Sequence, residues 1–237
     1  NAASRARKIA TIRSFYKYLT NKVHLIKENP VKDLDSPKLK KTLPKYLTLE
    51  ESVQLLSSVD GQNRERDYCI LTLFLNCGLR ISELCALNTT DIQDVALRVL
   101  GKGNKVRIVY LNDACKEALN GYLAVRRPIV GRDQNALFLS SRNERVSRST
   151  VHALVKKHLS EAGLDSTQYS AHKLRHTAAT LMLQNGVDVK AVQEVLGHEH
   201  LNTTEIYTHI DNEALRVAAK ANPLSRVKPP KKNEAGN

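Results

Sequence analysis

One short stretch of this chain is rich in β-forming residues, whereas almost everything around it follows helical spacing. Residues 97–100 and 106–111 are dominated by leucine, valine and isoleucine, and the glycine-containing segment 101–105 joins them, which predicts a β-hairpin. Apolar residues then recur at helical spacing over 113–127, 148–162, 171–185 and 188–196. The sequence therefore predicts an α+β fold that is mainly helical and contains a small antiparallel sheet.

Particular residue types indicate where helices begin and end. Thr48 is followed three residues later by Glu51, a capping-box pattern that begins the main domain. Gly186 and Gly197 follow helical segments at positions where a left-handed C-cap residue is expected. We therefore expect His198 to emerge directly from a helix end, where the backbone holds it rigidly.

Composition divides the chain into four segments. Residues 1–28 contain an amphipathic basic helix, which we interpret as the last helix of a small DNA-contacting domain whose first part is missing. Residues 29–46 combine three prolines with five lysines and no apolar period, which is typical of a linker. Residues 47–222 form the main domain. Residues 223–237 lose periodicity, so we expect a tail that is disordered or bound to a partner.

Charge is the strongest compositional signal. Lysine and arginine number 37 against 24 aspartates and glutamates, so the formal net charge is +13. Such an excess attracts polyanions, and nucleic acid is the commonest partner, although a merely soluble basic protein would show the same balance. The side chains expected to contact DNA are Arg7, Lys8, Arg13, Lys40, Lys41 and Lys105.

The chain lacks the patterns of membrane and secreted proteins. No stretch reaches the ~18 uncharged apolar residues that a spanning helix needs, and no signal-peptide pattern opens the sequence. The four cysteines show no CxxC spacing, and three of them lie in or beside the apolar run 69–79. We therefore predict reduced core cysteines, no membrane partner and a cytoplasmic location.

Histidines invite a metal-site interpretation, which the neighbouring residues disfavour. His172 and His176 are four residues apart on one expected helix, and a second pair of histidines flanks Glu199. However, Lys173 and Arg175 lie between the first two, and neither an HExxH motif nor a Cys–His pairing occurs. The sequence therefore predicts neither a metal nor a cofactor.

Phosphate chemistry fits the same residues better. His172 and Arg175 are three residues apart, so both project from one face of a helix. Arg80 precedes Glu83 by three residues, and a carboxylate can hold a guanidinium toward phosphate, although an ordinary surface ion pair would look the same. Tyr207 has a phenol with a pKa of about 10, so it would need a base and nearby cations to act as a nucleophile.

Four segments resemble one family in their order and spacing: GLRISEL, GKGNK before a strand, SAHKLRHTAAT, and LGHEHLNTTEIYTH. The chain is similar to the tyrosine recombinases, the phage-integrase family, and among them to the Xer-type members. The resemblance runs from about Ala6 to His209. It implies a mostly helical catalytic domain with a small sheet, preceded by a helical domain that closes around DNA.

The resemblance also implies a reaction. Tyr207 is the implied nucleophile, which attacks a DNA phosphodiester and leaves a 3′-phosphotyrosyl link with a free 5′-hydroxyl. His172 is implied to take the tyrosine proton and Lys102 to protonate the departing oxygen, while Glu83 supports Arg80. The implied donors to the transition-state charge are Arg80, Arg175 and His198.

Partners follow from the same resemblance. It implies double-stranded DNA with an inverted-repeat site, bound by a homotetramer or by a heterotetramer with a related recombinase. A helix after Tyr207 is expected to dock on a neighbouring subunit. The apolar residues expected at that contact are Ala214, Leu215, Val217 and Ala218. His176 is expected to pack or to support its neighbours rather than to catalyse.

Two other functions remain open from the sequence. A topoisomerase IB-like enzyme would share the chemistry but relax DNA as a monomer. A DNA-binding module without activity would need no intact catalytic set, and the match at all seven implied positions argues against it.

Overall fold

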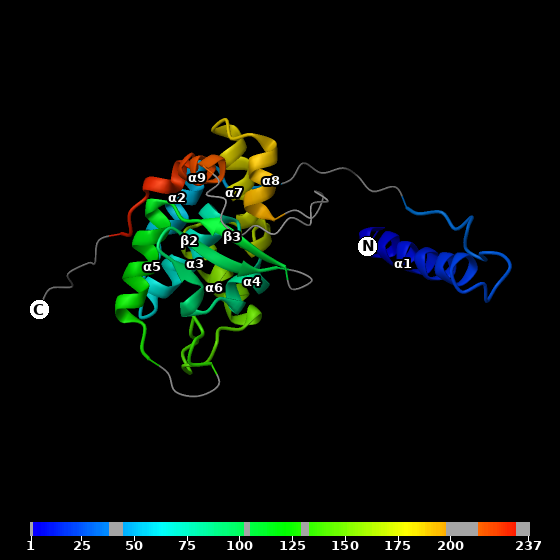
Figure 1. The fold of residues 1–237 in the computed structure, drawn as a ribbon, viewed down its shortest axis with the longest axis horizontal. Helices are drawn as coiled ribbons and strands as arrows, with labels where there is room; N and C mark the ends of the chain where they lie inside the picture. Colours follow the sequence, from blue (N-terminus) through cyan, green and yellow to red (C-terminus); the bar gives the residue numbers. More distant parts are fainter. Residues whose placement is uncertain (1, 38–44, 102–104, 129–132, 198–212, 231–237) are drawn as a thin grey trace, which may run out of the picture. The chain divides into compact units, whose positions relative to one another are not determined.

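The computed structural model describes residues 2–37, 45–101, 105–128, 133–197 and 213–230 (Figure 1). The chain divides into two compact units, residues 1–44 and 45–237. The boundary between them falls inside the segment 29–46, which the sequence indicates as a linker.

The first unit contains one long helix, α1 (Ala2–Asn21). Phe15 and Tyr18 are each 56 % exposed, and no described residue of this unit is buried. Arg13 donates a hydrogen bond to the carbonyl of Leu34, which ties the following chain to the helix. This unit therefore has no buried core within its described residues.

The second unit is built of short helices around a small sheet. Its strands are β1 (Ile92–Gln93), β2 (Ala96–Leu100) and β3 (Val106–Tyr110), and two 3₁₀ turns, η1 (Thr89–Asp91) and η3 (Pro223–Arg226), lie outside the α-helices. The helices are α2 (Leu49–Ser57), α3 (Arg64–Cys77), α4 (Ile81–Ala86), α5 (Asp113–Val125), α6 (Arg148–Glu161), α7 (Ala171–Gln184), α8 (Val189–Leu196) and α9 (Glu213–Lys220). These elements confirm the predicted mainly helical α+β fold.

Helix α3 is the centre of the core. Every residue from Asp67 to Cys77 is buried, because α5 and α7 pack against it. The helix ends at Gly78, whose φ of +57° is left-handed, and a Cβ there would lie 2.4 Å from Leu196 Cδ2. Only glycine therefore allows α3 to end this close to α8.

The sheet is antiparallel with the order β1-β2-β3, and Val99 pairs with Arg107. Leu97, Val99 and Val109 are buried in the core, whereas Leu100, Val106 and Ile108 on the opposite face are exposed. The predicted hairpin is confirmed to within one residue at its strand ends. The two-residue strand β1 was not predicted, because it is too short to show a period.

Capping residues behave as their sequence pattern indicates. Thr48 Oγ1 accepts the backbone N–H of Glu51, and the Glu51 carboxylate accepts that of Thr48, so α2 begins with a complete capping box. Gly197 ends α8 with a φ of +65°, and Gly186 follows α7 with a φ of +80°. Both glycines are thus left-handed, as predicted.

Four cysteines are free, as predicted, and three of them are buried. The Sγ atoms of Cys77 and Cys115 lie 3.6 Å apart, and burial raises the pKa of the Cys69 and Cys115 thiols. These thiols are therefore held in their neutral form inside the core. In the described part of the chain, no helix is long and apolar enough to cross a membrane.

The prediction of an unstructured tail from residue 223 is wrong for its first residues. Asn222 and Leu224 are fully buried, and the Asn222 side-chain amide donates to the Leu75 carbonyl at 3.0 Å. Val227 packs against the core as well. The buried side chains of Asn222 and Leu224 hold this segment against the core, although its sequence has no helical period.

The docking of the last helix on a neighbouring subunit stays a prediction, whereas within this chain Ala218 already has a packing partner. Helix α9 packs against α8 of its own chain, where Ala218 is only 2 % exposed (Figure 1). Asn112 reinforces this packing, because its buried amide donates to the carbonyl of Ala219 at 3.2 Å. Val217 remains 55 % exposed.

Candidate active site

The carboxylate of Glu83 organises the site. Helix α4 begins after Arg80, and Glu83 occupies its third position, so the carboxylate accepts the Arg80 backbone N–H at 2.7 Å. Arg80 Nη1 also donates to Glu83 Oε1 at 2.7 Å. The Glu83 side chain is only 3 % exposed, against 38 % for Arg80. The ion pair is therefore not an ordinary surface pair, because its acidic partner is buried.

Backbone carbonyls position the two predicted catalytic arginines. Arg175, on α7, donates from Nη1 to the Gly78 carbonyl at 2.5 Å and from Nη2 to the Leu196 carbonyl at 2.6 Å. Arg80 Nη2 donates to the Gly197 carbonyl at 3.1 Å. Neighbouring carbonyls at the end of α8 thus accept hydrogen bonds from both guanidinium groups, which brings Arg80 and Arg175 together.

The arginines of this cluster stay charged around one buried carboxylate. Burial, followed by the charge of Arg80, lowers the pKa of Arg175 to about 10, so its guanidinium stays charged at neutral pH. Burial raises the pKa of Glu83, but the hydrogen bonds and charge of Arg107 and the hydrogen bonds from Arg80 outweigh it and leave that pKa below its ordinary value. The site therefore pairs one ionised carboxylate with several fixed cations.

Arg107 belongs to this cluster and was missed in the sequence. It lies on β3, and its Nη1 and Nη2 donate to the two oxygens of Glu83 at 2.6 and 2.9 Å. A signal was present: in an alternating strand, Arg107 shares the inward face with Val109, which is 2 % exposed. A cation on the inward face of a strand needs a buried acidic partner.

His172 lies in the first turn of α7 and is exposed. The imidazole rings of His172 and His176 are nearly parallel, with centroids 6.3 Å apart. His176 is exposed as well, and its ring contact is with His172. That it packs against or supports its neighbours rather than catalysing stays a prediction. Partial burial, followed by the charges of Lys173 and His172, lowers the pKa of His176.

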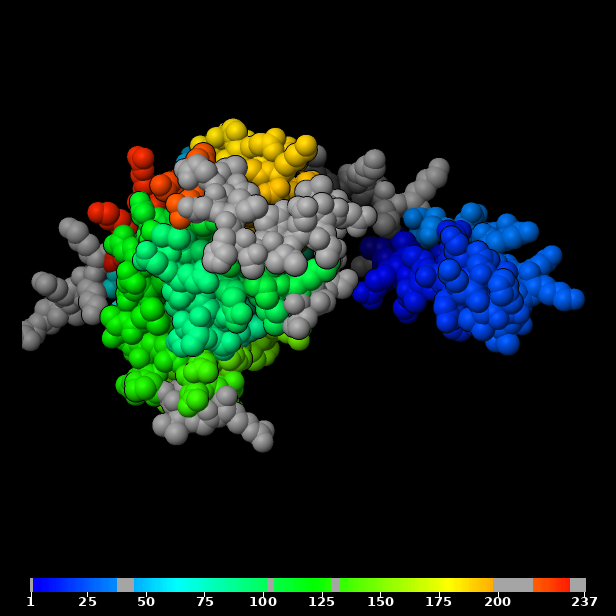
Figure 2. All heavy atoms as spheres, viewed as in Figure 1, coloured from blue at the N-terminus to red at the C-terminus, as the bar shows by residue number. Residues whose placement is uncertain are grey.

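Several predicted site residues lie outside the described residues: Tyr207, His198, Lys102, Lys40 and Lys41. Their neighbours are described. Gly101 donates its N–H to the Lys105 carbonyl at 2.7 Å, which closes the base of the hairpin turn, and Lys105 is exposed. The surfaces of α8 and of the β2–β3 hairpin appear on the same face of the unit (Figure 2). Arg7 and Lys8 are exposed on α1, in the other unit.

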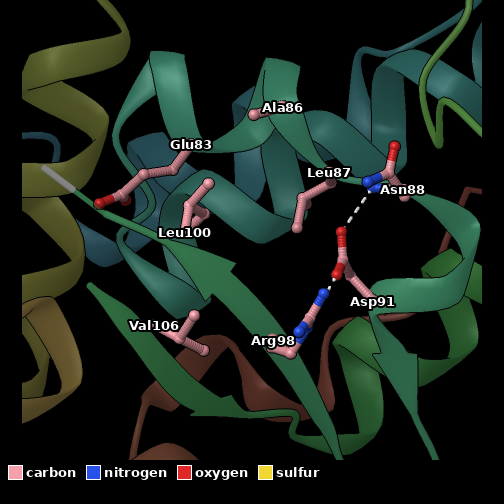
Figure 3. A pocket seen from close by; sticks show the side chains of 8 residues that line it. All are labelled: Glu83, Ala86, Leu87, Asn88, Asp91, Arg98, Leu100 and Val106. Atoms are coloured by element: carbon pink, nitrogen blue, oxygen red, sulfur yellow. Dashed lines mark hydrogen bonds and ion pairs between the residues drawn. The ribbon is translucent and has the colours of Figure 1, made fainter. Parts of the chain in front are cut away.

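A hollow of about 300 Å³ lies beside this cluster, between α4 and the β2–β3 hairpin. Leu100 and Val106 form its apolar wall, and an ion pair of 3.1 Å joins Arg98 and Asp91 at one end (Figure 3). Glu83 lines the hollow, but its carboxylate points away from the other lining side chains (Figure 3). The hollow is therefore separate from the arginine cluster.

A metal centre finds no support in this arrangement. Within the described ranges, no group of three or more histidine, cysteine, aspartate or glutamate side chains is placed to hold a metal ion. The chemistry available there is that of fixed guanidinium groups next to an exposed imidazole.

Comparison with known proteins places this geometry in a family. Residues 45–214 match the model of the phage integrase family. The tyrosine recombinase XerC of Caldanaerobacter subterraneus is 56 % identical over 224 residues, which cover 94 % of this chain and 64 % of that protein. The XerC of Thermodesulfovibrio yellowstonii is 40 % identical over 93 % of this chain and 76 % of its own length.

Solved structures agree with the sequence relatives. The crystal structure of XerA recombinase superimposes with a TM-score of 0.62 at 31 % identity and covers 88 % of this chain and 81 % of its own. XerH bound to difH substrate, in a pre-cleavage complex, gives a TM-score of 0.61 at 29 % identity over 83 % of this chain and 61 % of its own. These matches confirm the predicted family and fold. The chain belongs to the phage integrase family and is similar to the Xer tyrosine recombinases.

Proposed function

We propose that the protein recombines DNA at a specific site, cutting and rejoining strands through a 3′-phosphotyrosyl intermediate. One observation carries the proposal most directly: Arg80 and Arg175 are fixed on adjacent carbonyls of one helix end and share the buried carboxylate region of Glu83. Two fixed cations of this kind can bind the non-bridging oxygens of a phosphodiester. One such donor is often worth about 3 kcal/mol in the transition state.

In the proposed reaction, the phenolic oxygen of Tyr207 forms a bond to phosphorus and the bond from phosphorus to the 5′-oxygen breaks. His172 takes the phenol proton, and Lys102 supplies a proton to the departing oxygen. His198 is proposed to be a further donor to the transition-state charge. The free 5′-hydroxyl then attacks a phosphotyrosine on a partner strand, so bond energy is conserved and no ATP is consumed. Neither metal nor cofactor takes part.

We further propose that the substrate is double-stranded DNA with an inverted-repeat site, bound by a homotetramer or a heterotetramer with a related recombinase. The XerH structure, which contains difH substrate, and the net charge of +13 support a DNA partner. A protein that acts on DNA and keeps its cysteines free would work in the cytoplasm. The basic residues proposed to contact phosphate are Arg7, Lys8, Arg13, Lys40, Lys41 and Lys105.

Covalent trapping tests this function. Sites bound by the protein would be selected from random-sequence DNA and rebuilt as duplexes with a nick near the cleavage point, so that religation fails. We expect an SDS-resistant protein–DNA band that forms equally well in excess EDTA, because side chains supply the positive charge. Loss of the band in EDTA and its return with zinc or magnesium would contradict the metal-free mechanism.

The same DNA separates the remaining alternatives. Absence of any covalent band in every condition would mean a binding module without activity. Relaxation of supercoiled plasmids that lack the selected site would instead indicate a topoisomerase-like enzyme. Exchange of strands between two selected sites is the result that the proposal requires.

Binding should weaken steeply as salt increases, because many phosphate contacts release counterions. Each neutralised phosphate contributes about −0.9 to the slope of log K against log salt concentration. Fluorescence anisotropy across a salt series measures this slope. Lys105→Ala, which removes one exposed cation, should make the slope shallower by about 1. A slope near zero would show that the excess charge is not the binding surface.

A further inference from the structure

Arg107 binds Glu83 more completely than Arg80 does. Its guanidinium donates to both carboxylate oxygens, at 2.6 and 2.9 Å, whereas the Arg80 side chain reaches only Oε1, at 2.7 Å. Arg107 is also the less exposed of the two side chains, at 16 % against 38 %. The planar two-bond contact of Arg107 and the Arg80 backbone N–H, at 2.7 Å, together fix the Glu83 carboxylate, and the more exposed Arg80 guanidinium binds to it.

The aliphatic part of Arg107 packs against Gly197, whose carbonyl accepts the second guanidinium hydrogen bond of Arg80. A Cβ on Gly197 would lie 2.7 Å from Arg107 Cδ and 2.9 Å from its Nε, so this side chain lies flush on the Gly197 backbone. The Gly197 carbonyl accepts a hydrogen bond from Arg80 Nη2 at 3.1 Å. Arg107 thus contacts both residues that orient the Arg80 guanidinium, Glu83 and Gly197.

The hairpin turn reaches the same guanidinium. A Cβ on Gly101 would lie 3.8 Å from Arg107 Nη1 and 3.9 Å from Glu83 Oε1, so the base of the turn approaches the ion pair closely. Gly101 is followed directly by Lys102, the proposed acid. One partly buried side chain on β3 therefore touches α4 through Glu83, the end of α8 through Gly197, and the base of the lysine-bearing turn.

We propose that Arg107 is a positioning residue for strand cleavage: it holds Glu83 and Gly197 so that Arg80 presents its guanidinium to the scissile phosphate. Arg107 itself does not touch the reacting atoms. This inference rests on the proposed function, since it gives Arg107 a role only if Arg80 binds the phosphate that Tyr207 attacks.

Single-turnover cleavage of the nicked duplex, at saturating protein, tests the inference. We expect Arg107→Ala to cleave about 100-fold more slowly while its Kd for DNA changes by less than about threefold, because orientation rather than binding is lost. Arg107→Lys keeps the charge but cannot span both oxygens of Glu83, and should be at least about tenfold slow.

Arg98→Ala is the matched control. Arg98 lies on the adjacent strand β2, is 57 % exposed and pairs with Asp91 at 3.1 Å, so its loss removes the same charge and one ion pair from the same sheet. We expect its cleavage rate to stay within about threefold of the wild type, as for most surface substitutions. Thermal melting checks folding; if Arg107→Ala does not fold, Arg107→Lys decides the question.

A double variant separates positioning from a general structural role. If Arg107 acts through Arg80, then Arg80→Ala combined with Arg107→Ala should cleave no more than about threefold slower than Arg80→Ala alone. Rate losses that multiply would overturn the inference, and so would an Arg107→Lys protein as fast as Arg98→Ala. In both cases an active wild type leaves the proposed function standing, whereas a wild type that forms no covalent product overturns both.

Discussion

Tyr207→Phe is expected to bind DNA as tightly as the wild type and to form no covalent product at all. The substitution removes only the phenolic oxygen, so the ring and every cation that contacts phosphate are retained. No other group of the proposed site can form the phosphotyrosyl bond, and the loss should therefore be complete rather than partial. Denaturing gels of the nicked duplex measure the product, and a gel shift with the same DNA measures the affinity.

Tyr46→Phe provides the control for loss of a tyrosine hydroxyl. The hydroxyl of Tyr46 accepts a hydrogen bond from Gln184 Nε2 at 3.1 Å, and its removal should leave the covalent product unchanged. An SDS-resistant band from Tyr207→Phe would show that the nucleophile has been wrongly assigned.

Lys102→Ala is expected to cleave ordinary DNA very slowly and to recover most of its rate on DNA with sulfur as the 5′-bridging atom. An alkoxide has a conjugate acid with a pKa near that of water, about 15.7, so the 5′-oxygen needs a proton as it departs. A thiolate, whose conjugate acid has a pKa of about 8.5, departs without one. Sulfur substitution therefore removes the need for the acid alone, and single-turnover rates on the two duplexes measure the effect.

Lys105→Ala is the comparison within the same turn. Lys105 is exposed and closes the hairpin base through its carbonyl, so its loss should reduce affinity or slow cleavage modestly on both duplexes. Selective rescue of Lys105→Ala by sulfur, and not of Lys102→Ala, would make Lys105 the acid. Rescue of neither would mean that the hairpin only grips DNA.

Local patterns were sufficient to predict most of the fold. The hairpin followed from two β-rich runs around glycines, and α2 from the pairing of Thr48 with Glu51. These predictions succeeded because each depends on residues a few positions apart. The same holds for Gly197, whose left-handed conformation ends α8.

The nature of the Arg80–Glu83 pair could not be settled locally. An i,i+3 pair is compatible with a solvated helix surface. In the folded chain the Glu83 carboxylate is buried, and it also pairs with Arg107, which is distant in sequence. That contact joins β3 to α4 and depends on tertiary packing, which no short-range period encodes. Spacing thus identified the residues, and packing determined their environment.

Buried side-chain amides explain why the predictions for the C-terminal segment differ from the structure. Asn112 and Asn222 are polar and contribute nothing to an apolar period, yet each is buried and donates to a backbone carbonyl, of Ala219 and of Leu75. A satisfied amide can be buried at little cost, so it fastens a segment that looks hydrophilic in sequence. Hydropathy alone therefore assigned this segment to a tail.

Consecutive carbonyls at the end of α8 accept from both predicted catalytic arginines: Leu196 from Arg175, and Gly197 from Arg80. Hydrogen bonds weaken steeply with distance and angle, so a shift of that helix end would weaken one hydrogen bond of each guanidinium in a single motion. The helix also packs against α9, at whose base Asn112 binds the Ala219 carbonyl. We therefore expect the two guanidinium groups to respond together to any movement of α8, including one transmitted from α9.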